Sequence, residues 1–145
     1  MDPIYLCLIN MSLIFWLLYF SFFVQKDIIL YILATMIISN IILSQLFWSN
    51  PEKNSIIHMC DAIVAKIVIL TFIIYTCLYK LGNRKIVVIY LLLLIGIATS
   101  FYLSNHYSSK WCSPEHIRSH SCLHICCIFA SIFVFWFIHL KGLNI

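Results

Sequence analysis

The feature that most constrains this chain is a series of five apolar runs, each long enough to cross a membrane. A membrane-spanning helix needs about 20 predominantly apolar residues. The five runs cover residues 4–24, 28–48, 56–79, 86–104 and 116–140. Isoleucine, leucine and phenylalanine dominate them, without the polar and apolar alternation of barrel strands. The sequence therefore predicts an all-α, polytopic membrane helix bundle with five transmembrane helices.

The composition excludes a water-soluble domain. Hydrophobic residues make up 63% of the 145 residues and charged residues only 10%, whereas soluble domains are about half apolar and a quarter charged. No linker, internal repeat or low-complexity tract divides the chain, so we expect a single transmembrane helical domain over residues 1–145. The first run lacks a basic start and a small-residue cleavage site, and we expect it to be retained rather than removed as a signal peptide.

The cysteines and the net charge exclude further classes of function. Six of the seven cysteines lie inside apolar runs, where a thiol acts as a small hydrophobic group, and there is no Cys-x-x-Cys motif. The net charge is +4, but the basic residues form no cluster of the kind that a nucleic-acid site needs. We therefore expect membrane lipids, and no nucleic acid, among the partners.

Turn signals support the boundaries of two runs. Ser113 and Pro114 are typical of an N-cap and a first helical position, and they come just before the fifth run. Ser49 and Glu52 form a capping-box pattern before the third run, with Pro51 suited to a first helical turn. The third helix is therefore predicted to begin as early as Pro51.

The distribution of basic residues predicts an orientation in the membrane. With five spans, the N-terminus shares one side of the membrane with the loops after the second and fourth runs. Those two loops contain two lysines, Lys53 and Lys110. The opposite side has five basic residues: Lys26, Lys80, Arg84, Lys85 and Lys141. Because basic residues favour the cytoplasmic side, we expect the N-terminus outside or in a lumen and the C-terminus in the cytoplasm.

Ionisable residues within the apolar runs are the candidates for function. Near a helix centre such a residue costs about 2.5–3.5 kcal/mol on insertion scales, and it faces the bundle interior or water. The residues concerned are His58, Asp61, Lys66, Arg118, His120 and His124. His120 and His124 lie four residues apart on one helix face, and His58 and Asp61 three apart on another. With Ser44 at the end of the second run, the topology predicts that polar groups of three helices converge in the outer half of the membrane.

Three chemical interpretations of this convergence stay open. Neutral imidazoles and a carboxylate can bind zinc, which takes three protein ligands and a water in catalytic sites; His116 extends the histidine stripe by one more step. The cluster can instead hold helices together through hydrogen bonds, with no chemistry. A bis-histidine haem, pairing His58 with His120 or His124, is the third interpretation.

Short motifs in the second, third and fifth runs resemble a known superfamily of membrane proteins. The motifs are SQLFWSNP at residues 44–51, HMCDAIVAKIVILTFIIYT at residues 58–76, and the pair His120 and His124. They are similar to those of the CREST superfamily, which includes alkaline ceramidases, adiponectin-receptor-like and progestin-receptor-like proteins, and hemolysin-III-type proteins. The family pattern is Ser-x-x-x-His at the end of one helix, Asp near the start of the next, and His-x-x-x-His in the last.

The resemblance implies a zinc-dependent hydrolase that acts on a lipid amide or ester. Ser44 and Asp61 match the serine and aspartate that hold or activate the zinc-bound water, and they are the candidate catalytic residues. His120 and His124 match the last two zinc ligands. The resemblance thus implies zinc as the cofactor and a lipid as the substrate.

The chain departs from the family pattern at two points. Trp48 stands where the family has its first zinc-binding histidine, and an indole cannot bind a metal. The chain has five predicted spans where seven are usual. His58, one turn before Asp61, is the candidate third ligand in place of the missing histidine. The alternative is a non-catalytic relative whose polar cluster only holds helices together.

Overall fold

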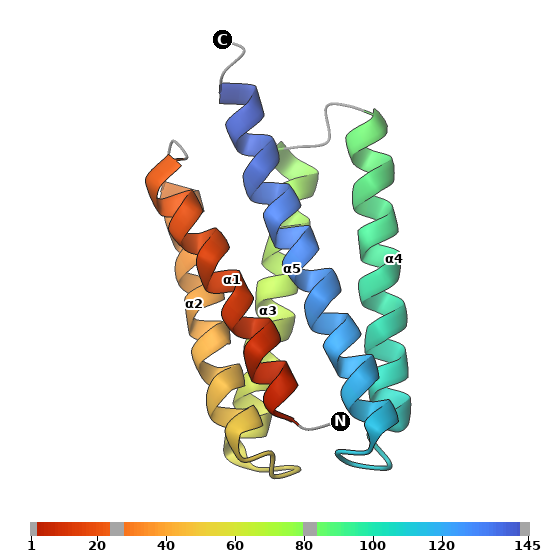
Figure 1. Cartoon of the computed structure of the whole chain (residues 1–145). Coiled ribbons are helices and arrows are strands. Elements are labelled where there is room, and N and C mark those ends of the chain that lie inside the picture. Colours follow the sequence, from red (N-terminus) through yellow and green to blue (C-terminus); the bar gives the residue numbers. More distant parts are fainter. Residues whose placement is uncertain (1–2, 24–27, 80–83, 143–145) are drawn as a thin grey trace.

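The structure of this protein, a computed structural model, describes residues 3–23, 28–79 and 84–142. These residues form five helices and no strand. The helices are α1 (Ile4–Phe23), α2 (Ile28–Ser49), α3 (Ile56–Tyr79), α4 (Arg84–Tyr107) and α5 (Pro114–Gly142). Successive helices run in opposite directions along one bundle axis (Figure 1). The predicted all-α fold class is confirmed.

Four of the helices are long and apolar enough to cross a membrane. They are Ile28–Ser49, Ile56–Leu78, Val87–Tyr107 and Pro114–Phe135. The apolar stretch described in full in α1, Ile4–Tyr19, is shorter than a span, so a crossing by α1 stays a prediction. Large apolar side chains such as Phe15, Ile56 and Tyr102 are exposed on the bundle surface. Soluble monomers rarely expose large apolar patches, so this is an integral membrane protein; which end faces the cytoplasm stays a prediction.

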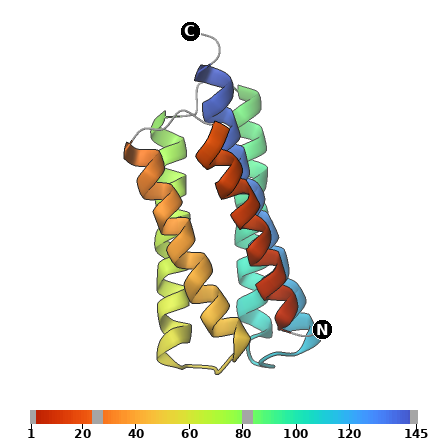
Figure 2. The same ribbon diagram turned by 60° about the vertical axis from the view of Figure 1, so that its left-hand side comes forward.

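The helices form a bundle that is open along one side. α1 packs against α2 and α5, α2 packs against α3, and α4 packs against α5, while α3 touches α5 only locally. Within the described residues, no Cα atom of α3 comes within 8 Å of one in α4. Figure 2 shows α2 and α3 on one side of the bundle and α1, α4 and α5 on the other. The seam between α3 and α4 is therefore not closed by helix packing.

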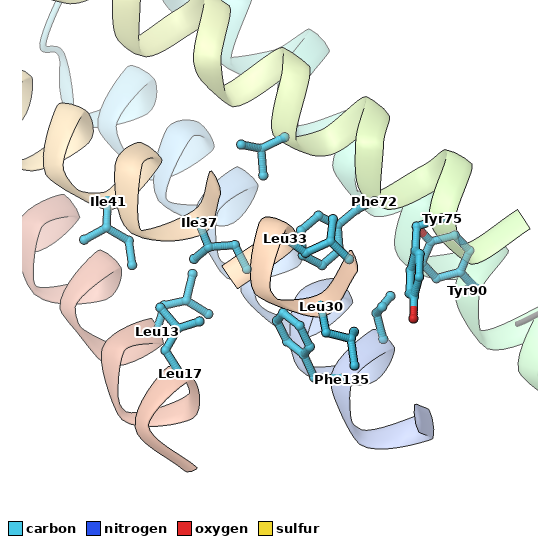
Figure 3. Packing of buried hydrophobic residues seen from close by; sticks show 12 residues of the cluster. Leu13, Leu17, Leu30, Leu33, Ile37, Ile41, Phe72, Tyr75, Tyr90 and Phe135 are labelled. Carbon is cyan, nitrogen blue, oxygen red and sulfur yellow. The ribbon is translucent and has the colours of Figure 1, made fainter. Parts of the chain in front are cut away.

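The main core lies in the half of the bundle that is far from the N-terminus. Leu30 and Leu33 of α2, Phe72 of α3 and Phe135 of α5 pack together there (Figure 3). Helices in lipid associate through close packing more than through the hydrophobic effect, which favours small residues where two backbones meet. Gly96 of α4 is such a residue, since a Cβ atom there would lie 3.3 Å from a cysteine Sγ of α5.

The start of α5 follows the sequence signal, whereas the start of α3 does not. The Ser113 carbonyl accepts the first backbone hydrogen bond of α5, from the N–H of Ile117, at 3.0 Å. The prediction that the third helix begins as early as Pro51 is wrong, because α3 begins at Ile56. Ser49 does not cap it: its Oγ donates to the Leu46 carbonyl at 3.0 Å, within the last turn of α2.

Candidate functional site

The loop before α3 ends in a compact cap that uses a histidine. Asn54 has a φ of 65°, in the left-handed region, so the helix cannot extend back through it. Ser55 follows as the N-cap, and its Oγ accepts the backbone N–H of His58 at 3.2 Å. The Nδ1 atom of His58 in turn accepts the backbone N–H of Asn54 at 3.1 Å. Serine and histidine together satisfy backbone donors at this helix start.

The loop before α5 repeats this cap. Cys112 has a φ of 56°, and Ser113 is the N-cap, with its Oγ accepting the backbone N–H of His116 at 3.2 Å. The Nδ1 atom of His116 accepts the backbone N–H of Cys112 at 3.3 Å. The shared sequence pattern is Ser-x-x-His after a residue of positive φ. His116 therefore has a local structural role.

This capping has a consequence for metal binding. A ring nitrogen that accepts an N–H is unprotonated, so in the neutral ring the proton lies on the other nitrogen. Metal-binding histidines show the opposite arrangement, with the second ring nitrogen donating to a neighbour. The His58 ring is also stacked on Phe47, with ring centroids 4.8 Å apart and planes at 14°. His58 is arranged as a helix cap and not as a third zinc ligand.

Four residues of these two loops form a clasp that joins them. Lys53 Nζ donates to the Ser108 carbonyl at 2.8 Å, and Trp111 Nε1 donates to the Pro51 carbonyl at 3.1 Å. The Lys53 ammonium also lies 5.7 Å from the centroid of the Trp111 ring, within the range of a cation–π contact. Cys112 packs beside the clasp, and burial raises the pKa of its thiol, which stays neutral at pH 7. The clasp holds the two loops together at this end of the bundle.

A cavity of about 410 Å³ lies inside the bundle, next to the clasp, and all five helices line it. Small-molecule sites typically enclose about 300–1,000 Å³. Four of the predicted site residues line the cavity, namely His58, Asp61, His120 and His124. Two helices, α3 and α5, bring these predicted polar residues to the cavity. The walls farther from the clasp are predominantly apolar.

Ser44, the fifth predicted site residue, does not line this cavity. Its side chain is 0% exposed, and its Oγ accepts a hydrogen bond from Asn10 Nδ2 at 2.7 Å. This bond joins α1 to α2. A second α1–α2 bond runs from Gln45 Nε2 to the Cys7 carbonyl at 2.7 Å. The Ser44 hydroxyl is therefore used in helix pairing.

His120 is also bound to a neighbouring helix. Its Nδ1 atom lies 2.8 Å from Ser104 Oγ, in a hydrogen bond between α5 and α4. The indole of Trp48, only 2% exposed, packs on the imidazole with ring centroids 4.8 Å apart. On the other side, the His124 ring lies at the same centroid distance of 4.8 Å. Trp48, at the position where the CREST pattern has a histidine, thus packs against one of the predicted zinc ligands.

Several buried polar groups at the cavity have no partner in the described part of the chain. Asp61 is 8% exposed and forms no hydrogen bond or ion pair there. His124 Nε2, Trp48 Nε1 and Asn40 Oδ1 are buried and unbonded, and all three residues line the cavity. Arg118, another ionisable residue of the apolar runs, is exposed and does not pair with Asp61. Because each unsatisfied buried group costs about 1–3 kcal/mol, this concentration of them calls for an explanation.

The residues do not fit the three-ligand zinc site that the resemblance implies. Among the side chains that the structure describes, no group of three histidine, cysteine, aspartate or glutamate residues is arranged to hold a metal ion. His58 and His116 are used as caps, which leaves His120 and His124 as the histidines whose bonding is compatible with a ligand. Two ligands do not make the usual zinc site. A bound zinc ion and a bound haem both stay predictions.

Three residues of the site were not found from the sequence, because the candidates were the ionisable side chains and Ser44. Asn10 pairs with Ser44, Ser104 pairs with His120, and Asn40 has an unbonded buried oxygen at the cavity. The sequence did contain a signal for these polar residues. Asparagine is rare in apolar spans, and polar side chains there commonly form bonds between helices.

The Ser104–His120 bond can be tested with a double-mutant cycle. Ser104→Ala and His120→Ala should show a coupling of about 0.6 kcal/mol in the free energy of unfolding, the average measured for such bonds in membranes, and at most about 1.7 kcal/mol. The measurement is unfolding in a graded detergent mixture. The matched control is the cycle of Ser104→Ala with His124→Ala, which should show no coupling. Equal coupling in both cycles would contradict a hydrogen bond specific to Ser104 and His120.

The chain was also compared with known proteins. No protein-family model, curated protein or solved structure matches it. The resemblance to the CREST superfamily therefore depends on the short motifs alone, and the function has to be inferred from the residues of the bundle itself.

Proposed function

We propose that this membrane protein binds one single-chain lipid inside its helix bundle. By single-chain lipid we mean a molecule with one hydrocarbon chain and a polar head group, such as a fatty acid, a fatty alcohol or a lysolipid. The observation that supports this best is the cavity: near one end its lining residues include Asp61 and residues with unpaired buried polar atoms, and beyond them the lining is predominantly apolar. Because it lies in membrane-spanning helices, lipids are the most abundant molecules around it.

The polar and apolar parts of the cavity follow one another along the bundle axis. At about 1.5 Å per residue, Asp61 lies about 8 Å and Phe72 about 24 Å from the start of α3. His124 lies about 15 Å from the start of α5 by the same measure. The far end is lined by apolar residues of α3 and α5, among them Ile73 and Ile128. A lipid would therefore lie along the axis, with its head group towards the clasp.

The dimensions of the cavity suit one hydrocarbon chain. Its α5 lining extends from His116 to Ser131, which is about 22 Å along the helix. One leaflet of the hydrocarbon core is about 15 Å thick, so a head group and one chain fit this length. Divided by this length of about 22 Å, the volume of about 410 Å³ gives a mean cross-section of about 19 Å². A helix of about 10 Å diameter would need a far larger cross-section.

A bound head group would remove the energetic cost of the unpaired groups. Asp61 and the Asn40 oxygen accept hydrogen bonds, the Trp48 indole donates one, and His124 Nε2 can do either according to its tautomer. Head groups with hydroxyl, carboxyl or amine groups offer partners to such a set. A lipid in the cavity would thus stabilise the bundle as well as fill it.

A purely structural role is a second candidate for part of the cluster. The bonds Asn10–Ser44 and Ser104–His120 each tie two helices together, as expected for a structural role. That role gives no reason for the unpaired groups Asp61, Trp48 and His124. We therefore assign the bonded pairs to helix association and the unpaired groups to lipid binding.

Chain-length selectivity tests the lipid-binding proposal. Ile73→Trp should fill the far end of the cavity and shift binding from longer to shorter saturated fatty acids, because the longer chains no longer fit. Native mass spectrometry of the protein, released from detergent in the presence of an equimolar fatty-acid mixture, measures the bound species directly. We expect one bound fatty acid per wild-type chain.

The neighbouring residue supplies a matched control. Ile74 is exposed and does not line the cavity, so Ile74→Trp should leave the chain-length preference unchanged. Absence of a bound fatty acid in the wild type, or the same shift in both variants, would contradict lipid binding in this cavity.

Metal analysis tests the hydrolase interpretation separately. Because, among the described residues of the cavity, His120 and His124 alone are suitably arranged, we expect well under one zinc per chain when purified protein is analysed by inductively coupled plasma mass spectrometry. The double variant His120→Ala, His124→Ala serves as the reference. One zinc per wild-type chain that is lost in the double variant would contradict our assignment and favour a zinc enzyme.

A further inference from the structure

We infer that the lipid reaches the cavity sideways from the bilayer, through a slot between α3 and α4; this inference rests on the proposed lipid binding. The slot is the opening flanked by Ala65 and Lys66 of α3 and by Phe101 of α4. All three residues line the cavity. The exposure of lining residues and the helix packing support this route. The clasp makes entry from the aqueous side less favourable.

The exposed residues of the cavity wall point to this slot. Among the described lining residues, those of α1, α2 and α5 are buried or half-buried. Within the helices, the exposed lining residues are Lys66 of α3 and Phe101 and Asn105 of α4. The cavity therefore reaches the surface of the membrane-spanning region between these two helices.

Helix packing leaves the same seam open. The seams α1–α2, α2–α3, α4–α5 and α1–α5 are closed by helix contacts. The described parts of α3 and α4 line the cavity together, yet their backbones do not approach within 8 Å. Figure 2 shows the separation of α3 from α4 along the bundle. A hydrocarbon chain can pass between two helices that are not packed, without unfolding either one.

The clasp lies across the route from the aqueous side, where Lys53 and Asn54 are exposed lining residues of the cavity. The bonds Lys53–Ser108 and Trp111–Pro51 hold the two loops across the adjacent end of the cavity. A lipid that came from this side would have to break both bonds and expose its chain to water. A lipid already in the bilayer has neither requirement.

The slot also offers polar groups to a passing head group. Asn105 is exposed two residues before the end of α4, close to the membrane interface. Lys66 lies deeper, about 15 Å along α3, where an unpaired charge is costly unless it meets polar groups or water. The flexible lysine side chain can keep its ammonium on a head group as the head group moves inwards. Asn105 and Lys66 thus provide a polar edge from the interface to the cavity.

Two substitutions with opposite expected effects test the slot. Ala65→Phe should narrow it and slow lipid uptake and release in parallel by about tenfold, the effect of about 1.4 kcal/mol of added barrier. Phe101→Ala should widen the slot and accelerate both rates, with Kd nearly unchanged in each case. Stopped-flow energy transfer from the protein's tryptophans to cis-parinaric acid, a fluorescent fatty acid delivered from vesicles to the reconstituted protein, measures the rates. Misfolding cannot produce both effects.

Matched substitutions outside the cavity give the controls. Ala98 and Phe129 are exposed and do not line the cavity, so Ala98→Phe and Phe129→Ala should leave both rates unchanged. Lys53→Met removes one of the two clasp bonds, Lys53–Ser108, and should not accelerate uptake. Faster uptake in Lys53→Met, with normal rates in both slot variants, would overturn the lateral route and leave lipid binding intact. No saturable energy transfer in the wild type would overturn lipid binding itself.

Discussion

The absence of water from the hydrocarbon core is the constraint on which the rest of this structure depends. A polar group there must find its partner within the protein or in a bound molecule, because lipid tails offer none. Asn10 with Ser44, and Ser104 with His120, meet this requirement by pairing across helices. Asp61 and the unpaired atoms of Trp48 and His124 have no such partner in the described part of the chain. The difference between the paired and the unpaired groups separates the parts of the cluster that build the bundle from the parts available to a ligand.

The histidine stripe of α5 shows this separation within one helix. His116 accepts a backbone N–H and caps the helix start, and His120 forms a bond to α4. His124, one turn farther on, has a buried nitrogen without a partner. Three residues with the same side chain and the same spacing thus have three different roles. Trp48, at the position where the CREST pattern has its first histidine, packs its indole beside His120.

The parts of the fold that depend on local sequence could be predicted, and the parts that depend on helix rotation could not. The apolar runs lie within three residues of the helix bounds, because hydropathy and helix length are properties of each segment alone. The apolar run has the start of α3 at Ile56, as in the structure, but the capping-box pattern pointed to Pro51, because Ser49 and Ser55 both suit an N-cap and the left-handed backbone at Asn54 selects the second. The Ser44–Asn10 bond, which removes Ser44 from the cavity wall, depends on how α1 and α2 face each other. No spacing within one run contains that information.

The central claim is that a single hydrocarbon chain occupies the cavity along the bundle axis. The most direct measurement is photolabelling of the reconstituted protein with a fatty acid that has a diazirine at the end of its chain, followed by peptide mass spectrometry. Label should concentrate at the far end of the cavity, around Ile73 and Ile128, and unlabelled fatty acid should compete with it. Label spread over the outward faces, at residues such as Phe15 and Ile32, without such competition, would contradict the claim.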